Sequence, residues 1–273
     1  MGNRKTAPVG VFDSGVGGLT VAREISRQLP NENIVYFGDT ARVPYGSKSQ
    51  NTIIRFSEQI IRFLKTKDVK AIVIACNTAS ALALETVRDE YDIPILGVVV
   101  PGARAAVETT KNKRVGVVGT DATVQSGMYT KVIQEMEPGI KVIEKACPLF
   151  VPLVEEGFKE HTVTDEIIEY YLESMRNTGI DAMILGCTHY PLLRSKIRAY
   201  MGEEIQIVNP AYETAMDLKR LLRENDMEND GREGTHGKYS FYVSDAAEKF
   251  RRFANTVMPF DVPTTNVVNI EGY

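Results

Sequence analysis

Two cysteines occupy equivalent positions in two separate parts of the sequence. The segments "AIVIACNTASALAL" (residues 71–84) and "AMILGCTHYPLL" (residues 182–193) each run from an apolar strand into a cysteine and then into polar residues. Cys76 is followed by Asn-Thr and Cys187 by Thr-His, which are residues typical of a helix start. A helix N-terminus favours the thiolate form of a cysteine, so both positions suit chemistry as well as packing.

Several kinds of thiol chemistry can be compared with this pattern. A metal site needs three or four ligands at suitable spacing, whereas the segment 187–189 lies far from any C-x-x-C motif. A dithiol redox centre usually carries C-x-x-C, which the sequence lacks. A cysteine hydrolase uses one Cys with one His and leaves the second Cys unexplained. Simple burial remains the alternative for any single cysteine, and it is the interpretation that we favour for Cys147 in "KACPLF".

A symmetric pair of thiols suits a symmetric reaction such as racemisation. Racemisation removes a proton from one face of a carbon and returns a proton to the other face, so it needs one base and one acid. Free thiols titrate near pH ~8.5, close enough to neutrality for either role. Asp13 follows the first strand and His189 lies two residues after Cys187, so each is a candidate to relay protons to a thiol. A turn or capping role is the alternative for Asp13, and a helix-start hydrogen bond is the alternative for His189.

Strands that alternate with helices are expected to position these residues. This alternation predicts parallel sheets covered by helices, and runs such as "AIVIA" fit strands that are buried on both faces. Strands are predicted at 9–12, 34–37, 71–75, 95–100, 114–118, 141–145, 182–185, 205–208, 238–245 and near 267–270. The helices predicted between them include 52–65, 78–90, 103–110, 122–135, 164–178 and 212–225.

The two halves of the sequence also resemble each other. "VGVFDSG" (9–15) is similar to "VGVVGTD" (115–121), and "KAIVIACNT" is similar to "DAMILGCTH", although short apolar strands can match by chance. We therefore expect an α/β protein with two similar lobes. The first lobe is predicted to comprise residues 1–98 and 211–273, and the second residues 99–210. Because ligands bind beyond the carboxyl ends of parallel strands, the two thiols are expected to face each other across a cleft between the lobes.

Composition narrows the possible partners. The 273 residues are 43% apolar and 25% charged, and the net charge is −4. The sequence has no stripe of basic residues that could neutralise a nucleic-acid backbone, so a nucleic-acid partner is not expected. Three cysteines do not indicate a disulfide framework and fit a reducing, cytoplasmic setting. No apolar run reaches 18 residues and the first residues lack a signal-peptide core, so neither a membrane span nor export is expected.

Signals for a cofactor are weak. "GVGG" at 15–18 does not complete G-x-G-x-x-G, because Thr20 stands where the last glycine would be, and no Gly-Lys-Ser/Thr loop occurs. No lysine stands out as an anchor for pyridoxal phosphate. We therefore expect no cofactor and no metal. The glycines at 15–18 are expected to let backbone N–H groups at a helix start approach a carboxylate.

Five motifs carry a resemblance to a known family. "GVFDSGVGGLTV", "GDTARVPYG", "ACNTAS", "CPLFVPLVEEG" and "LGCTHYPLL" resemble, in the same order, the motifs of the glutamate racemases, in the cofactor-independent aspartate/glutamate racemase superfamily. The resemblance covers about residues 8–222. It implies a two-lobed α/β enzyme that interconverts L- and D-glutamate and so supplies D-glutamate for bacterial peptidoglycan. It also implies a homodimer, without indicating which face pairs.

The same resemblance implies roles for individual residues. Cys76 would take the proton from D-glutamate and Cys187 from L-glutamate, with Asp13 and His189 assisting them. Glu155, which we favour over Glu156, would lie near the substrate ammonium or His189. The substrate contacts that the resemblance implies are Asp13, Ser14, Tyr45, Gly46, Asn77, Thr78, Thr120, Thr123, Thr188 and His189. Hydroxyls, amides and helix-start N–H groups suit the two carboxylates of glutamate without any basic side chain.

Two other functions remain open on the sequence. The chain could be a racemase for aspartate or another small amino acid, which a panel of substrates would separate from a glutamate racemase. It could also be a two-lobed protein that closes on an amino acid without chemistry, which exchange of the substrate α-proton would reveal. The polar stretch 226–238 is predicted to be a loop, and the sequence does not indicate whether it orders on binding.

Overall fold

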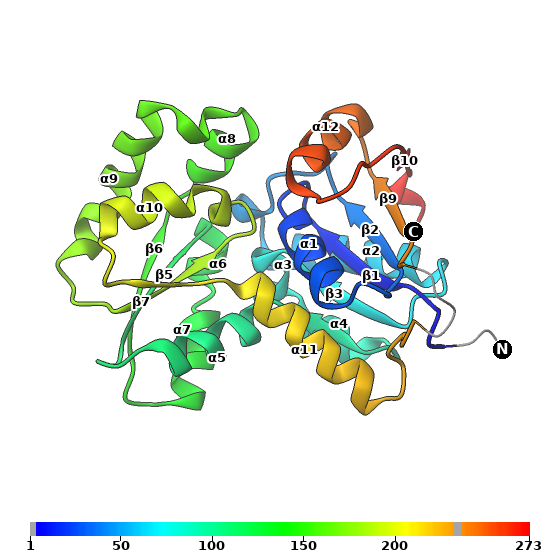
Figure 1. Cartoon of the computed structure of the whole chain (residues 1–273), viewed down its shortest axis with the longest axis horizontal. Helices are drawn as coiled ribbons and strands as arrows, with labels where there is room; N and C mark the ends of the chain where they lie inside the picture. The colour runs from blue at the N-terminus through cyan, green and yellow to red at the C-terminus, as the bar shows by residue number, and fades with distance from the viewer. Residues whose placement is uncertain (1–3, 232–235) are drawn as a thin grey trace.

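Two parallel sheets form the centres of the two halves of the molecule (Figure 1). The computed structural model describes residues 4–231 and 236–273. In the described residues the first sheet has the strand order β10-β9-β2-β1-β3-β4 and the second β6-β5-β7-β8, and all their pairings are parallel. The strands are β1 (Val9–Asp13), β2 (Ile34–Gly38), β3 (Ala71–Ile74), β4 (Ile95–Gly97), β5 (Arg114–Gly119), β6 (Lys141–Ala146), β7 (Ala182–Gly186), β8 (Gln206–Val208), β9 (Tyr239–Val243) and β10 (Thr265–Val267). The predicted fold class is confirmed.

Helices cover both faces of each sheet, because successive side chains of a buried strand point to opposite faces. In the first half, α1, α11 and α12 share one core with Val9 and Val11, and α2, α3 and α4 share another with Phe12. In the second half, α8, α9 and α10 cover one face and α5 and α7 the other. The α-helices are α1 (Leu19–Gln28), α2 (Gln50–Lys65), α3 (Asn77–Leu82), α4 (Leu84–Glu90), α5 (Val99–Thr109), α6 (Asp121–Gln125), α7 (Met128–Met136), α8 (Phe150–Glu155), α9 (Thr162–Arg176), α10 (Arg194–Met201), α11 (Pro210–Glu224) and α12 (Ala247–Val257). Short 3-10 turns are η1 (Tyr45–Ser47), η2 (Phe158–Glu160), η3 (Tyr190–Leu193) and η4 (Ile270–Gly272).

The internal similarity of the sequence corresponds to a repeated topology. The order β2-β1-β3-β4 in the first sheet has the same pattern as β6-β5-β7-β8 in the second, and β9 and β10 extend the first sheet alone. Val9 of β1 pairs with Ala71 of β3, and Val115 of β5 pairs with Ala182 of β7. Cys76 follows β3 and Cys187 follows β7. The two cysteines therefore leave equivalent strands of the two sheets.

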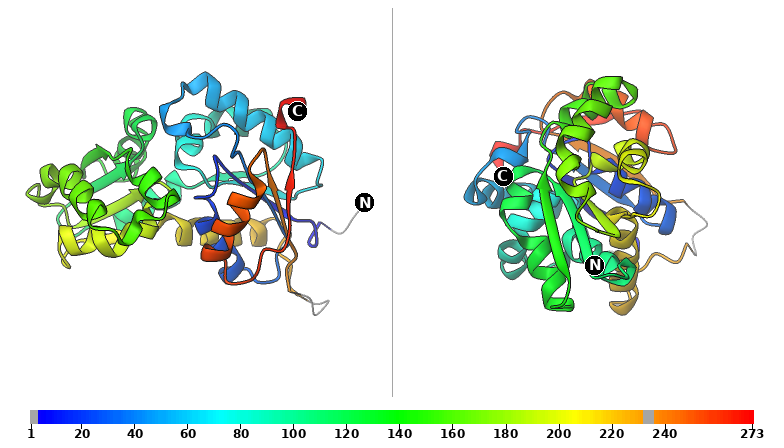
Figure 2. Two further views of the ribbon diagram at one scale, coloured as in Figure 1. Left: turned by 90° about the horizontal axis from the view of Figure 1, so that it is seen from above. Right: turned by 90° about the vertical axis from the view of Figure 1, so that its left-hand side faces the viewer.

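Helices α5 and α11 make the two connections between the halves. α5 leads from β4 to β5 and α11 leads from β8 back toward β9, and the two helices pack against each other. Arg104 of α5 holds Asp217 of α11 with two hydrogen bonds of 2.7 and 2.9 Å. Figure 2 shows the halves side by side, with the C-terminus in the first half.

Several element boundaries differ from the sequence-based expectation. The helix predicted at 122–135 is broken into α6 and α7 at Gly127, whose φ of +60° is a conformation suited to glycine. The helix predicted at 78–90 is interrupted at Ala83, for which we have no physical explanation. The strand predicted at 95–100 ends at Gly97, because α5 already begins at Val99 and accepts Pro101 in its first turn, where no N–H donor is required.

Toward the end of the chain, the strand predicted near 267–270 is β10 at 265–267 followed by η4. Within the predicted loop 226–238, residues 232–235 lie outside the described residues. In the parts of the chain that the structure does describe, no helix combines the length and apolarity needed to cross a membrane.

Candidate active site

A cavity of about 340 Å³ lies between the two halves, and residues of both halves line it. Its walls come from the loops that follow the carboxyl ends of β1, β2, β3, β5, β6 and β7, as expected for parallel sheets. The volume lies in the range of pockets for small molecules. Its lining residues are Ser14, Val43, Pro44, Tyr45, Gly46, Ser47, Cys76, Asn77, Thr78, Thr120, Asp121, Pro148, Val151, Pro152, Glu155, Cys187, Thr188 and His189.

Cys76 lies at the first-half wall of this cavity, as the N-cap residue of α3. Burial and the nearby carboxylate of Asp13 raise the pKa of Cys76 to about 12. Hydrogen bonds from the Ala79 backbone and the Ser14 side chain act in the opposite direction but are outweighed. With this pKa, Cys76 carries its proton near neutral pH, which is the form required of an acid.

Asp13 is fully buried behind the wall and does not line the cavity. Burial raises its pKa, although its carboxylate accepts hydrogen bonds from the backbone N–H groups of Gly15 (2.9 Å) and Gly18. The glycine-rich segment was expected to offer such N–H groups to a carboxylate, and in the structure they bind the chain's own Asp13. Thr188 Oγ1 donates to the other carboxylate oxygen at 3.3 Å, so Asp13 also contacts the second half.

Cys187 and His189 form the second-half wall together with Glu155. Cys187 Sγ lies 3.8 Å from His189 Nδ1, and His189 Nε2 lies 3.0 Å from Glu155 Oε1. Burial alone would disfavour the charged imidazole, but the hydrogen bonds to Cys187 and Glu155 outweigh it and raise the pKa of His189 to about 10. The hydrogen bond from His189 lowers the pKa of Glu155. Glu156 lies outside this group and pairs with Lys249 at 3.1 Å.

Gly17 allows the two halves to approach each other beside the cavity. A Cβ atom at this position would lie 2.3 Å from Thr188 Oγ1 and 2.5 Å from His189 Nδ1, distances that no side chain tolerates. The hydroxyl of Thr20, at the start of α1, lies 2.9 Å from the Gly17 carbonyl oxygen and 3.2 Å from the Thr188 carbonyl oxygen, so the two acceptors share its proton. The segment that carries Cys187 and His189 therefore packs directly on the start of α1. Apart from the glycines themselves, no sequence pattern indicates this contact.

Three threonine hydroxyls meet across the cleft. Thr78 Oγ1 lies 2.9 Å from Thr120 Oγ1 and 3.2 Å from Thr123 Oγ1, and Thr120 and Thr123 are 3.0 Å apart. Thr78 and Thr120 line the cavity, whereas Thr123 is fully buried behind them. Gly46 fits against Thr120, because a Cβ at Gly46 would lie 2.7 Å from Thr120 Cβ. The loop with Tyr45 and Gly46 thus closes one end of the site.

The structure brings most of the residues predicted for the site around one cavity. Asp13 and Thr123 are the exceptions, and both hydrogen-bond residues that do line it. The lining residues that sequence reasoning missed are Val43, Pro44, Ser47, Asp121, Pro148, Val151 and Pro152. Most of them lie within the "GDTARVPYG" and "CPLFVPLVEEG" motifs, which were the available signal. In residues 4–231 and 236–273, no group of three or more His, Cys, Asp and Glu side chains is arranged to hold a metal ion.

Comparisons with known proteins find one family throughout. Residues 9–217 match the Asp/Glu/Hydantoin racemase family. A glutamate racemase of Geobacter metallireducens is 47% identical over 264 residues, which cover 97% of this chain and 97% of that protein. Among solved structures, a glutamate racemase isoform of Bacillus anthracis has a TM-score of 0.93 at 39% identity, covering 97% of this chain and 98% of that one. A glutamate racemase of Francisella tularensis, solved in complex with D-glutamate, has a TM-score of 0.91 at 37% identity, covering 98% of this chain and 100% of that one.

Because the family match spans most of the chain and the relatives are similar over nearly their whole length, this chain belongs to the Asp/Glu/Hydantoin racemase family, and within it to the glutamate racemases.

Proposed function

We propose that this chain interconverts L- and D-glutamate by moving the substrate α-proton between two thiols, without a cofactor. One observation carries the proposal: Cys76 and Cys187 leave equivalent strands of two sheets and line a single cavity. The relatives named glutamate racemase support the choice of substrate. The complex of the Francisella protein with D-glutamate supports it further.

In the L-to-D direction, Cys187 as thiolate takes the α-proton from one face of L-glutamate, and its S–H bond forms as the C–H bond breaks. Cys76 gives its proton to the other face, so its S–H bond breaks as the new C–H bond forms. Because the pKa of Cys76 is high, the thiol keeps this proton until the transfer to the α carbon. Protonated His189, 3.8 Å from the Cys187 sulfur, can donate a hydrogen bond to the thiolate that starts the reaction.

The D-to-L direction uses the same groups with their roles exchanged. The two productive forms of the enzyme hold one proton between the two sulfurs and differ only in which sulfur carries it. An enzyme that has converted L-glutamate is therefore ready for D-glutamate, and it returns to its first form by proton exchange with water or buffer. Asp13, close to Cys76, and the His189–Glu155 pair, close to Cys187, are the groups that we propose assist this exchange.

Neutral donors are proposed to hold the substrate carboxylates. No Lys or Arg is present among the described residues that line the cavity, whereas Ser14, Asn77, Thr78, Thr120 and Thr188 offer hydroxyl and amide groups. Helix α3 begins in the wall, although it is too short to act as a strong dipole. We propose that Tyr45 and Gly46 close over the substrate, and that Glu155 faces its ammonium group or acts only through His189. Asp13 and Thr123 do not line the cavity and would act through the lining residues that they hydrogen-bond.

We also propose the setting in which the reaction takes place. The chain would act in the cytoplasm as a homodimer and supply D-glutamate for peptidoglycan. The division into lobes at 98/99 and 210/211 is supported by the strands, since those of the first sheet come from residues 9–97 and 239–267 and those of the second from 114–208. The two α-helices at these boundaries, α5 and α11, would be the hinge elements between the lobes.

The test is α-proton exchange in deuterated water. Incubation of the purified chain with L-glutamate, without pyridoxal phosphate, should give D-glutamate that carries deuterium at the α carbon, and D-glutamate should give deuterated L-glutamate. Cys76→Ala and Cys187→Ala should each abolish racemisation while the protein stays folded by circular dichroism. Racemisation that persists in either variant contradicts the two-thiol mechanism. Faster turnover of aspartate than of glutamate would contradict the substrate, and tight binding without exchange would indicate a binding protein.

A further inference from the structure

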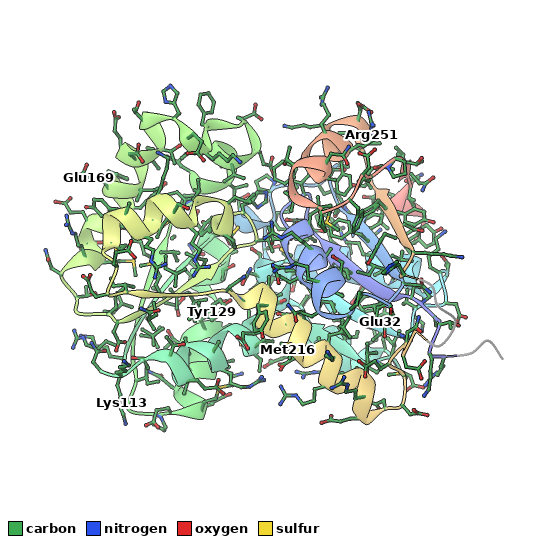
Figure 3. All side chains as sticks on the ribbon, viewed as in Figure 1. Glu32, Lys113, Tyr129, Glu169, Met216 and Arg251 are labelled. Atoms are coloured by element: carbon green, nitrogen blue, oxygen red, sulfur yellow. The ribbon has the colours of Figure 1, made fainter. Side chains whose placement is uncertain are left out.

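Tyr129 occupies a position that links the two halves beside the cavity without lining it. It belongs to α7 in the second half, where it is labelled in Figure 3. Its side chain is fully buried. Its ring lies against the end of β7, where a Cβ at Gly186 would come within 3.1 Å of Tyr129 Cε2. Its hydroxyl lies near α5, where a Cβ at Gly102 would come within 3.4 Å of the oxygen. Because Gly186 directly precedes Cys187, the ring of Tyr129 is fixed relative to the Cys187 backbone.

The hydroxyl of Tyr129 reaches into the first half. It donates a hydrogen bond of 2.7 Å to Asn77 Oδ1, and both residues are buried. Asn77 directly follows Cys76 and lines the cavity. Burial raises the pKa of Tyr129 well above its ordinary value, so the phenol keeps its proton and remains a donor. A single side chain thus touches the residue before Cys187 and the residue after Cys76.

This hydrogen bond decides how the Asn77 amide is oriented. A buried hydroxyl needs an acceptor for its proton, and in the described part of the chain the Tyr129 hydroxyl has no acceptor other than Asn77 Oδ1. With its oxygen held by Tyr129, the Asn77 amide has its NH₂ group left for the cavity. A carboxylate accepts hydrogen bonds and cannot donate them, so only this orientation of the amide suits an amino-acid carboxylate.

We propose that Tyr129 is a positioning residue that turns the Asn77 NH₂ group toward a carboxylate of the substrate. This inference rests on the proposed function, because it names the group of the substrate that Asn77 binds. Without Tyr129 the amide can turn its oxygen toward the carboxylate, which loses a donor and adds a repulsion between two acceptors.

The test begins with Tyr129→Phe, which removes one oxygen atom and keeps the ring that packs on Gly186. We expect the KM for L-glutamate and for D-glutamate to rise roughly five- to tenfold, which is the loss of affinity that corresponds to the free energy of one hydrogen bond. We expect kcat to change less. A donor that binds the carboxylate in the ground state as well as in the transition state contributes to substrate binding, so its loss raises KM. The matched control is Tyr171→Phe, a buried tyrosine of the same half whose hydroxyl bonds the Leu149 backbone, and its KM should equal that of the wild type.

A double-variant cycle separates positioning from simple stability. In an Asn77→Ala background, Tyr129→Phe should change KM by less than twofold, because the amide that it orients is gone. Asn77→Asp keeps an acceptor for Tyr129 but places a carboxylate where the NH₂ was, so its KM should exceed that of Asn77→Ala. All variants are compared by thermal unfolding, and rates are expressed per folded protein.

The outcomes distinguish this inference from the proposed function. If the wild-type protein racemises glutamate but Tyr129→Phe retains the wild-type KM, or raises KM equally with and without Asn77, the positioning role is wrong and the racemase remains. If the wild-type protein shows no α-proton exchange, the proposed function itself fails. A fall in kcat and unfolding temperature with unchanged KM would make Tyr129 a structural residue and would overturn the inference.

Discussion

Glu155 holds His189 at the edge of the imidazole ring that faces away from Cys187, with 3.0 Å between Glu155 Oε1 and His189 Nε2. The other ring nitrogen, Nδ1, faces the Cys187 sulfur at 3.8 Å. This arrangement gives the imidazole an acceptor on each side once Cys187 is a thiolate, and it raises the pKa of His189 to about 10 against the effect of burial. Near neutral pH the ring therefore carries a proton that it can share with the sulfur.

Glu155→Gln removes the carboxylate and keeps the size of the side chain. We expect the pKa of His189 to fall and the alkaline limb of kcat/KM against pH to move down by about one pH unit or more, as expected for the loss of a charge-assisted hydrogen bond. Rates measured from pH 6 to 10 test this. The matched control is Glu156→Gln, whose carboxylate is exposed and paired with Lys249, and its profile should overlie that of the wild type. If the alkaline limb of the Glu155→Gln profile were not shifted, the pKa of His189 would not depend on Glu155.

The same pair makes stability depend on pH in a defined window. The folded pKa of His189, about 10, exceeds its ordinary value of 6.5, so its stabilising contribution is complete below pH 6.5 and is lost as pH rises through 10. The pKa of Glu155 is lowered from 4.5, so its contribution is present above pH 4.5 and is lost as pH falls through the folded value. We expect the free energy of unfolding, measured in urea, to decline more steeply between pH 6.5 and 10 in the wild type than in Glu155→Gln. If the free energy of unfolding fell equally steeply with pH in both proteins, the proposed link between the pKa of His189 and stability would be contradicted.

Asp13→Asn should make the Cys76 thiol easier to ionise. Burial is the larger reason for its pKa of about 12 and remains in the variant, but the repulsion between the Asp13 carboxylate and the thiolate disappears. We expect alkylation of Cys76 by iodoacetamide, followed by mass spectrometry in a Cys187→Ser background, to begin at lower pH. Cys147 does not line the cavity, is fully buried and has a pKa of about 12, so its alkylation should be the same with and without Asp13→Asn and serves as the internal control. A Cys76 titration that is unchanged, or shifted upward, would contradict the role of Asp13.

Gly17→Ala should impair catalysis much more than folding. The added methyl group would overlap Thr188 Oγ1 and His189 Nδ1, so the side chains of Thr188 and His189 must move away from the start of α1. A displacement of about 1 Å in a catalytic group can cost roughly 100-fold in rate, and we expect a fall in kcat of this order. The comparison is Gly272→Ala, where nothing lies within 4 Å of the added Cβ and kcat should not change. A Gly17→Ala enzyme with the wild-type kcat would show that the contact is not needed.

Local patterns in the sequence predicted most of the fold. Continuous apolar runs identified the buried strands, and the similarity between 9–15 and 115–121 predicted the repeated sheet topology, because both signals lie within a few consecutive residues. The break at Gly127 was not predicted, since a left-handed glycine is one of several ways in which Ser-Gly can be accommodated. The early start of α5 was missed because Pro101 was read as the end of a strand, although proline is also tolerated in a first helical turn.

Contacts between the halves could not be predicted from the sequence. Cys76, Cys187 and His189 were predicted as site residues from their local motifs, and all three line the cavity. The contact of Thr20 with Thr188 joins residues 168 positions apart, and that of Tyr129 with Asn77 joins residues 52 apart. Such pairs depend on the angle at which two lobes meet, which no local pattern encodes. Threonine at position 20 fits a helix start equally well, and its second partner is visible only in the folded chain.

A buried ion pair lies at the opposite end of the first sheet from the cavity. Glu32 precedes β2 and Lys70 precedes β3, so both stand at the amino ends of strands, and Glu32 is labelled in Figure 3. Lys70 Nζ lies 2.5 Å from Glu32 Oε2, with both side chains at most 1% exposed. Lys70 also donates to the Met227 carbonyl oxygen at 2.8 Å, and Glu32 accepts from the Asn229 backbone at 2.8 Å. The pair therefore attaches the segment after α11 to the sheet.

Lys70→Met should lower the free energy of unfolding by about 3–5 kcal/mol, because it leaves the Glu32 carboxylate buried without a counter-charge. Removing both charges, in Lys70→Met with Glu32→Leu, should recover much of that loss, since an apolar pair of similar volume avoids the desolvation of two ions. Urea denaturation measures both effects, and kcat per folded protein should stay at the wild-type value because the pair lies far from the cavity. A double variant less stable than Lys70→Met would mean that the backbone hydrogen bonds to Met227 and Asn229, and not the ion pair, hold this end of the lobe together.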